Sequence, residues 1–245
     1  MAFEHPSAHD PPQTRGFVRD LFAGIAPVYD LGNRLLSLGL DSRWRRAQVA
    51  ELPRDGVIID VGAGTCDVGL AYLARRDVCG YVICADLTPE LLARGVDKLR
   101  HAGQAGRFAA VICDATALPF REGSASAVTS AFMLRHLAVR GGFWRECVRV
   151  LERDGRLALM EIAEPRSRVM RWAFDVYFAR IAPTIMRLLS RHAYGYAYLP
   201  ASLEGFPSPE DLARECSDAG LADARADRFC PDAAAIVRAR RGRVL

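Results

Sequence analysis

The residues best suited to chemistry stand together near position 60, where an acid and two glycines follow a short apolar run. The stretch Val57–Asp67 reads Val-Ile-Ile-Asp-Val-Gly-Ala-Gly-Thr-Cys-Asp. Its β-branched start is typical of a buried strand. Gly62 and Gly64 lack a Cβ atom, so the backbone can bend sharply there and a ligand can lie close to it. A helical pattern follows in Val68–Arg76, which predicts the strand–turn–helix unit that opens a nucleotide-binding α/β domain.

The residues of this turn distinguish two classes of cofactor. Dinucleotide-binding turns have the pattern G-x-G-x-x-G, but Asp67 occupies the position of the third glycine, which argues against NAD and FAD. The carboxylate of Asp60 would repel a pyrophosphate and suits a cation. S-adenosylmethionine (SAM) carries a sulfonium and an ammonium group and no phosphate. The stretch Asp60–Gly64 therefore favours a SAM site, and a turn that binds no ligand is the alternative.

A second acid ends the next apolar run, Tyr81–Asp86. Asp86 lies roughly 20 residues beyond the glycine turn, where a carboxylate commonly binds the ribose hydroxyls of a nucleotide. An acid at this place can instead cap the following helix. Because Thr88-Pro89-Glu90 carries its own capping residues, we expect Asp86 to be available for ribose.

Two further apolar runs end in polar residues. Phe108–Cys113 leads to Asp114 and Ala115, which are placed to meet an adenine amino group and ring; a carboxylate that merely starts a loop is the alternative. Ser126–Met133 leads to Leu134, Arg135 and His136. The carboxyl ends of parallel strands meet at one edge of a sheet. We therefore expect the polar residues at the strand ends to converge on one site, whose rim carries Asp60, Asp86, Asp114 and Arg135.

The alternation of strand and helix patterns predicts an α/β fold, a doubly wound parallel sheet with helices on both faces. Residues 16–245 are expected to form one domain, in which 16–52 is a helical cap before the glycine turn. Residues 1–15 are polar and rich in proline, which predicts a disordered tail. Near the end of the chain, Arg225–Cys230 and Ala234–Arg240 have the pattern of two closing strands.

Bulk composition excludes several other classes. Hydrophobic residues make up 51% and charged residues 25%, as in globular proteins. The net charge of +4 comes from dispersed arginines, so we expect no nucleic-acid partner. None of the seven cysteines forms a zinc-type C-x-x-C pair, which predicts reduced thiols, no metal and a cytoplasmic protein. The apolar stretch Val169–Leu189 is interrupted by charges, so it should touch a membrane surface rather than span it.

At this point the sequence resembles the UbiE-like ubiquinone/menaquinone biosynthesis C-methyltransferases, a branch of the class I SAM-dependent methyltransferases. The resemblance spans nearly all of residues 17–240. It rests on these motifs: residues 22–30, Asn33, 36–39, 44–46, 62–65, Ala85-Asp86, Asp114-Ala115, 118–120, Leu134-Arg135, 196–199, Ser202 and Phe206-Pro207.

The resemblance implies a Rossmann-like sheet of seven strands in the order 3-2-1-4-5-7-6, with strand 7 antiparallel. It implies that SAM is bound by Thr65, Asp86, Asp114, Ala115 and Ser130, and we expect Asp60, Gly62, Gly64 and Leu87 to join them in the cofactor site. It also assigns Tyr29 and Arg135 to a quinol site. The chain departs from the family pattern at Cys66, where glycine is usual, at His136, where asparagine is usual, and at Arg153-Asp154, where Pro-Gly is usual.

The implied reaction is C-methylation of a demethylated prenyl-quinol, such as demethylmenaquinol or a ubiquinol precursor. Arg135 would stabilise the phenolate, His136 would act as base or positioning group, and Tyr29 would orient the acceptor. Alternatively, Arg135 pairs with an acid such as Glu161 and His136 only caps the strand end. Two other functions stay open: methylation of another small aromatic compound, and SAM binding without catalysis as a partner of quinone-biosynthesis enzymes. A homodimer is a further expectation.

Overall fold

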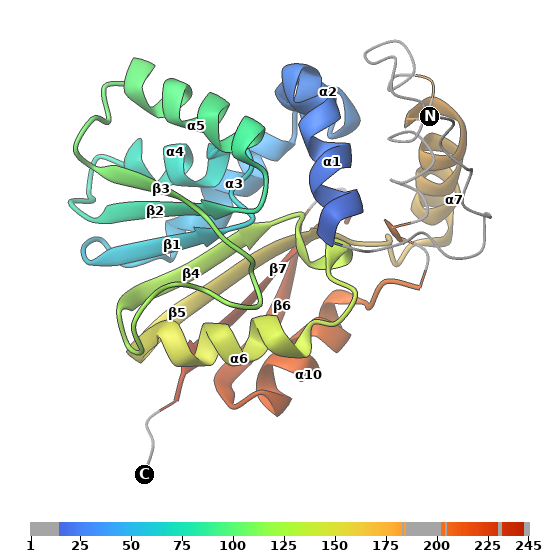
Figure 1. Ribbon diagram of the computed structural model, residues 1–245. Coiled ribbons are helices and arrows are strands. Elements are labelled where there is room, and N and C mark those ends of the chain that lie inside the picture. Colours follow the sequence, from blue (N-terminus) through green and yellow to red (C-terminus); the bar gives the residue numbers. More distant parts are fainter. Residues whose placement is uncertain (1–14, 183, 185–201, 204, 230–231, 243–245) are drawn as a thin grey trace.

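The computed structural model describes residues 15–182, 184, 202–203, 205–229 and 232–242, and these form one mixed sheet with helices on both of its faces (Figure 1). The strand order is β3-β2-β1-β4-β5-β7-β6. Strand β7 pairs antiparallel with both neighbours, while the other pairs are parallel. The expected order and the antiparallel seventh strand are thus confirmed. The bounds are β1 Val57–Val61, β2 Tyr81–Asp86, β3 Phe108–Ile112, β4 Ala125–Ala131, β5 Leu151–Ile162, β6 Leu221–Phe229 and β7 Ala234–Arg241.

Two groups of helices cover the sheet. Helices α3 (Asp41–Ala50), α4 (Asp67–Leu73) and α5 (Pro89–His101) lie on one face, and α6 (Gly141–Val150) and α10 (Pro209–Asp218) lie on the other (Figure 1). Strand β1 is apolar at almost every position because both of its faces are covered. On it, Ile58 packs on the side of α3 and α4, whereas Ile59 and Val61 pack on the side of α6.

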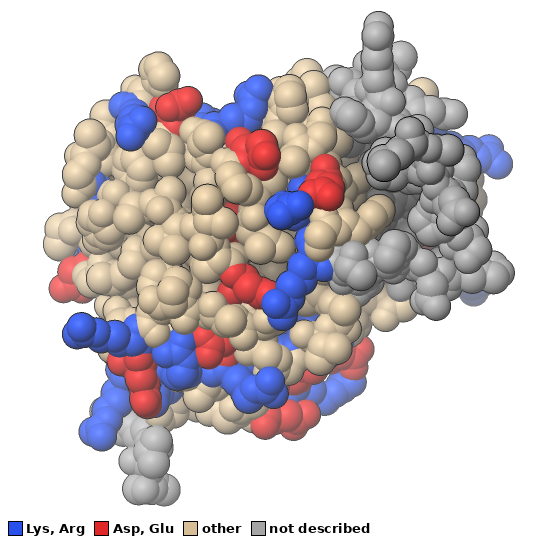
Figure 2. Space-filling view, viewed as in Figure 1, with Lys and Arg blue, Asp and Glu red and all other residues tan. Residues whose placement is uncertain are grey.

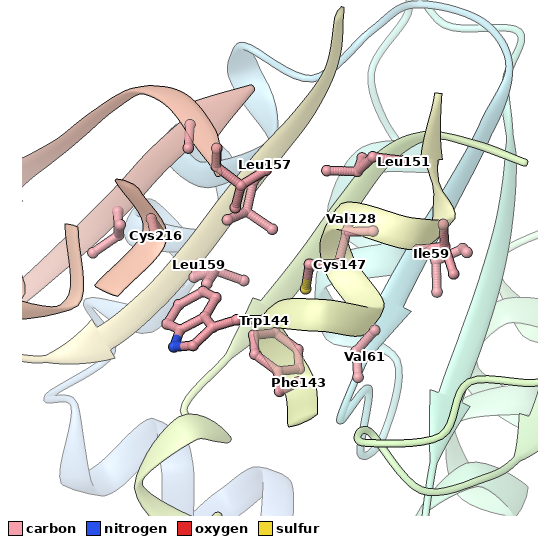
Figure 3. Packing of buried hydrophobic residues seen from close by; sticks show 14 of the residues in the cluster. Ile59, Val61, Val128, Phe143, Trp144, Cys147, Leu151, Leu157, Leu159 and Cys216 are labelled. Carbon is pink, nitrogen blue, oxygen red and sulfur yellow. The ribbon is translucent and has the colours of Figure 1, made fainter. Parts of the chain in front are cut away.

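The larger part of the core lies under α6. Its Phe143, Trp144 and Cys147 project toward Val128 of β4 and Leu159 of β5 (Figure 3). Trp144 is 5% exposed, and the other four side chains are at most 1% exposed. Close packing on this face fixes the positions of β1, β4 and β5, and therefore the direction in which their carboxyl ends open.

Three short helices precede the sheet and close over those carboxyl ends. Helix α1 is Arg15–Ile25, η1 is Ala26–Val28 and α2 is Tyr29–Leu36. Proline 27 stands in the short η1 turn, where its missing N–H removes no helical hydrogen bond. Helix α1 already begins at Arg15, which the sequence assigned to a disordered tail; residues 1–14 lie outside the described part of the chain.

Other differences from the expected elements are local. The expected turn at Asp154 and Gly155 is part of β5, which begins at Leu151; Asp154 adopts a left-handed backbone with φ of 60°. Beyond β5, α7 (Arg168–Val176) continues into a π-helical turn, η3 (Tyr177–Ile181). The motif residues 196–199 lie outside the described residues. No helix in the described part of the chain is long and apolar enough to cross a membrane.

Candidate active site

A cavity of about 300 Å³ opens at the carboxyl ends of β1, β2 and β4, beneath α1. Eight of the site residues expected from the sequence line it: Tyr29, Gly62, Gly64, Asp86, Leu87, Asp114, Ala115 and His136. The sheet brings these residues together from segments far apart in the chain. Helix α1 completes the wall with Arg15, Val18 and Phe22, which the sequence did not single out as site residues.

The glycine turn needs its glycines for a steric reason. Gly62 has a φ of 66°, and a Cβ atom there would lie 2.4 Å from Cγ of Met133. Cys66, in the position where the family usually has glycine, has a φ of 61° and is buried. Its side chain fits because α5 carries Gly95 opposite; a Cβ on Gly95 would lie 2.3 Å from the Cys66 sulfur. The departure at Cys66 is therefore accommodated by packing against α5 and leaves the cavity open.

Asp86 links the glycine turn to the start of α5. Its two carboxylate oxygens accept backbone hydrogen bonds from Gly64 (2.7 Å) and Thr88 (2.7 Å). The Thr88 side chain makes no capping hydrogen bond, so the expected division between Thr88 as cap and Asp86 as free acid is corrected. Burial raises the pKa of Asp86, and the backbone donors offset part of that rise. Each carboxylate oxygen keeps a lone pair that can accept a ribose hydroxyl.

Asp114 is held by its neighbours just beyond β3, close to Asp86, whose backbone oxygen accepts a hydrogen bond from the Cys113 N–H (3.0 Å). One oxygen accepts from the backbone and the hydroxyl of Thr116, both at 2.7 Å. The other lies 2.7 Å from Nη1 of Arg15, the first residue of α1. A contact between Asp114 and an adenine amino group would therefore compete with the Arg15 ion pair.

Three expected cofactor residues do not line the main cavity. Asp60 is fully buried beneath the glycine turn, because side chains alternate along β1 and its neighbour Val61 takes the place facing the cavity. Burial raises the pKa of Asp60 to about 8, although the Arg45 charge and the backbone N–H of Gly69 oppose that rise. Ser130 is likewise buried next to Ala131, which does line the cavity. Thr65 lines only a void of about 10 Å³ beside Tyr29.

Thr65 belongs to a polar cluster that the sequence did not assign to the site. Its hydroxyl donates to Asp30 of α2, and Lys98 of α5 contacts Thr65 (3.1 Å), Asp30 (2.9 Å) and Asp67. Lys98 is the only lysine in the sequence, and this is the one sequence feature that could have drawn attention to it as a site residue. The cluster ties α2, and with it Tyr29, to the glycine turn and to α5.

A second hollow, an apolar groove of about 310 Å³, lies beside the cavity between α2 and α7. Its wall includes Leu36, Trp44, Met170 and Phe174. The groove is held closed at one side by the Tyr177 hydroxyl, which donates to the backbone oxygens of Leu35 and Leu36, both at 3.1 Å.

One residue, Phe132, lines both hollows. Its φ of 60° is a left-handed conformation that is uncommon for an aromatic residue and clusters at functional sites. The guanidinium groups of Arg135 and Arg45 lie 5.5 and 5.8 Å from its ring centre. Phe132 thus lies at the border that the cavity and the groove share, with two cations beside its ring.

Arg135 and His136 face different hollows although they are adjacent in η2 (Leu134–His136). Arg135 lines the groove, and its Nη1 lies 3.0 Å from Oε2 of Glu161; the two side chains are 8% and 3% exposed. The alternative in which Arg135 pairs with Glu161 is therefore realised. His136 lines the cavity with its ring edge-on to Phe22. Desolvation and the Arg135 charge lower the pKa of His136 well below 6.5, so the imidazole is neutral at pH 7.

The residues of the cavity fit SAM. Asp86 offers acceptors to hydroxyl groups. At Gly62 there is no room for a larger side chain, so the backbone itself borders the cavity. An apolar wall for a base is formed by Leu87, Leu91 and Ala115. The cavity presents no cluster of cations of the kind that binds a pyrophosphate; Arg15, the single Lys or Arg among the described lining residues, is paired with Asp114.

Comparisons with known proteins agree with this geometry. The sequence profile of the ubiE/COQ5 methyltransferase family matches residues 10–241. The chain is 36% identical over 208 residues to the ubiquinone/menaquinone biosynthesis C-methyltransferase UbiE of Geobacter sulfurreducens, covering 84% of this chain and 81% of that protein. It is 40% identical over 205 residues to the demethylmenaquinone methyltransferase of Thermus thermophilus, covering 82% and 91%.

The fold is also similar to that of a SAM-dependent methyltransferase from Aquifex aeolicus, with a TM-score of 0.58 and 16% identity over 80% of this chain and 89% of that one. The cavity and the family match together identify the cofactor as SAM. The chain is a SAM-dependent methyltransferase and belongs to the ubiE/COQ5 methyltransferase family.

Proposed function

We propose that the protein methylates a ring carbon of a demethylated prenyl-quinol in respiratory quinone biosynthesis. The observation that carries this proposal is the meeting of a SAM-type cavity and an apolar groove at Phe132. An aromatic ring at that junction would face the cavity, while an attached isoprenoid tail would follow the groove. The printed names of relatives, UbiE and demethylmenaquinone methyltransferase, support this acceptor class.

The chain's own residues would hold the two reactants in line. When bound, SAM supplies a methyl group on a positive sulfur, which a carbon nucleophile can attack. Asp86 and Leu87 would hold the ribose, and Ala115 would pack on the adenine. Reaction requires the two reacting atoms to be held about 3–3.5 Å apart. Phe132, which lines both hollows, would contact the acceptor ring where the cavity meets the groove.

Activation of the acceptor requires its hydroxyl to pass a proton to water, which makes the neighbouring ring carbon nucleophilic. Transfer of the methyl group would release S-adenosylhomocysteine, and the proton displaced from the ring carbon would also pass to water. Arg135 carries a permanent charge that can stabilise the resulting phenolate, and Glu161 fixes its orientation. Burial raises the pKa of Tyr29, so its hydroxyl stays protonated and donates. His136 is a weak base because of its low pKa, which favours a positioning role over proton abstraction.

One observation favours a second acceptor class. His136 lines the cavity where the resembling family has asparagine, so the acceptor ring can differ from that of the family. A small aromatic compound without a tail is this second candidate.

The experiment that separates the two is a panel of demethylated quinols with and without isoprenoid tails. We expect turnover of tailed quinols, with a lower KM than for the matching ring alone. Met170→Glu, in the groove wall, should raise KM for tailed quinols and leave KM for tail-less rings unchanged. Turnover of tail-less rings only would refute the prenyl-quinol proposal and support the second candidate.

A prenylated acceptor partitions into lipid, so a peripheral contact with the inner face of the membrane and a cytoplasmic location belong to the same proposal. The homodimer stays a prediction, which sedimentation of the purified protein would test.

A further inference from the structure

Helix α7 is apolar in composition yet not one of its nine residues is buried. It contains Val169, Met170, Trp172, Ala173, Phe174 and Val176. Val169 is 74% and Trp172 is 68% exposed. Its charged residues, Arg168, Arg171 and Asp175, lie together on one side, and the apolar residues form a broad face over the rest. An apolar helix face normally packs against protein or lipid. Figure 1 places α7 at the side of the molecule, away from β3.

Only one side of α7 has a partner in the described structure. Met170, Ala173 and Phe174 line the groove. Successive residues of a helix are rotated by about 100°, which places Trp172 on the side opposite the groove. That outer side also carries Arg168 and, at its flank, Val169. The groove therefore accounts for apolar side chains at Met170 and Phe174. It does not account for the exposed apolar side chains of Trp172 and Val169.

The other rim of the groove also exposes a large apolar residue. Leu38 lines the groove, is 73% exposed and has a φ of 52°. The left-handed conformation is costly for a leucine, and the side chain it presents gains no burial. Leu35, one turn before it, is 40% exposed. Both rims of the groove therefore present exposed apolar side chains.

The charges on α7 and η3 have a dominant sign. Arg168, Arg171 and Arg180 are exposed on α7 and η3, against the single acid Asp175. By contrast, Lys and Arg are interspersed with Asp and Glu on the face drawn in Figure 2, notably over α6 and α10. Apolar side chains bordered by arginines are the composition of a helix that lies in the interface of an anionic bilayer.

We propose that Leu38, Val169 and Trp172, with Arg168 and Arg171, form a docking surface for an anionic lipid bilayer. In this orientation the apolar groove borders directly on the lipid, so an isoprenoid tail passes from bilayer to groove without crossing water. The biological reason for docking rests on the proposed function. The docking itself is a property of the surface, and it has its own readout.

Tryptophan fluorescence provides that readout. Trp172 is exposed, whereas Trp44 and Trp144 are each only 5% exposed. The probes are vesicles of phosphatidylcholine, with and without phosphatidylglycerol, and the same vesicles with brominated acyl chains. We expect a blue shift and quenching with anionic vesicles, both absent from Trp172→Phe if Trp172 is the reporter, while that variant still co-sediments. Quenching that persists unchanged in Trp172→Phe would overturn the assignment of the surface.

Two variants test the surface itself. Val169→Ser with Trp172→Ser should lower partition into anionic vesicles by about tenfold or more, because two inserted side chains are lost. Arg168→Gln with Arg171→Gln should reduce the preference for anionic over neutral vesicles. Ile112→Ser, a 61% exposed residue on the distant strand β3, is the matched control and should partition like the wild type. SAM affinity should stay unchanged in all of them.

The outcomes distinguish the two proposals. Partition of the Val169/Trp172 variant equal to wild type refutes the docking surface, whatever the activity. A concentration-dependent dimer lost in that variant, without vesicle binding, assigns the surface to a second copy of the chain and also refutes the proposal. Vesicle binding at this surface without turnover of any prenyl-quinol supports the docking surface and refutes the proposed function.

Discussion

The ion pair of Arg135 and Glu161 gives the sharpest test of the reaction centre. Two unit charges 3.0 Å apart attract by about 5.5 kcal/mol at an effective dielectric constant of about 20. Removing one partner of such a buried pair commonly costs about 3–5 kcal/mol, since the other charge stays buried. Arg135→Ala should therefore lower the free energy of unfolding by that amount, which is a large part of the roughly 5–15 kcal/mol typical of a domain.

The loss of stability should depend on pH in a defined direction. Burial already raises the pKa of Glu161 above 4.5, and Arg135 opposes that rise. Without Arg135 the pKa of Glu161 climbs further, so protonation relieves the buried charge more readily. The difference in unfolding free energy between wild type and Arg135→Ala should thus shrink as the pH falls toward this raised pKa. Urea unfolding at several pH values measures it.

The same variant should lower kcat by roughly 10²–10³, the scale of losing one electrostatic stabiliser. SAM affinity by calorimetry should hardly change, because Arg135 lines the groove and not the cavity. Stability and catalysis are separated by Arg135→Met with Glu161→Gln, which removes both charges. Glu161→Gln alone keeps the guanidinium but, with its amide oxygen on the Leu134 N–H, presents an NH2 group to Arg135, so it tests whether Glu161 orients Arg135.

We expect the double variant to recover most of the lost stability and to remain slow. Glu161→Gln should lower kcat by less than Arg135→Ala does, because the charge remains while its orientation is less fixed. A double variant with both wild-type stability and wild-type kcat would refute the catalytic assignment. It would leave Arg135 as a purely structural partner of Glu161.

Three further variants test the polar groups around the cavity. In the wild type, Asp60 has a pKa of about 8 when folded, so the folded state retains a proton between about pH 4 and 8, and the free energy of unfolding falls as the pH rises. Asp60→Asn should make the free energy of unfolding, measured with urea, nearly independent of pH over this range. An unchanged slope against pH would contradict the raised pKa. His136→Asn should keep most of the activity. The pH–rate profile of the wild type should lack a limb near 6.5, because the pKa of His136 is well below that value. A loss of rate beyond about 100-fold in the variant would make His136 the base. Lys98→Met should weaken SAM binding by about fivefold, because a partly exposed contact to Asp30 is lost. Arg100→Met, at an exposed position on the same helix, should leave SAM binding unchanged. Equal effects of the two variants would show that Lys98 does not position α2.

The sequence alone predicted the elements whose signals are local. The β-branched run at Val57, the acid that ends Tyr81–Asp86 and the glycine turn between them all correspond to observed bounds. Alternating strand and helix patterns gave the α/β class, and the resemblance supplied the strand order that the structure confirms. These features depend on residues within a few positions of each other, or on one repeated pattern, so they survive without knowledge of long-range contacts.

What only the tertiary structure decided is which side chains face the site. Asp60 and Val61 are adjacent, yet only Val61 borders the cavity, because the opposite face of β1 is packed under α4. Arg135 and Glu161 are 26 residues apart and meet only through the pairing of β4 with β5. Side-chain direction has a local period, but the face that becomes the site is set by what packs against it. That choice depends on contacts between distant segments, which the sequence pattern does not contain.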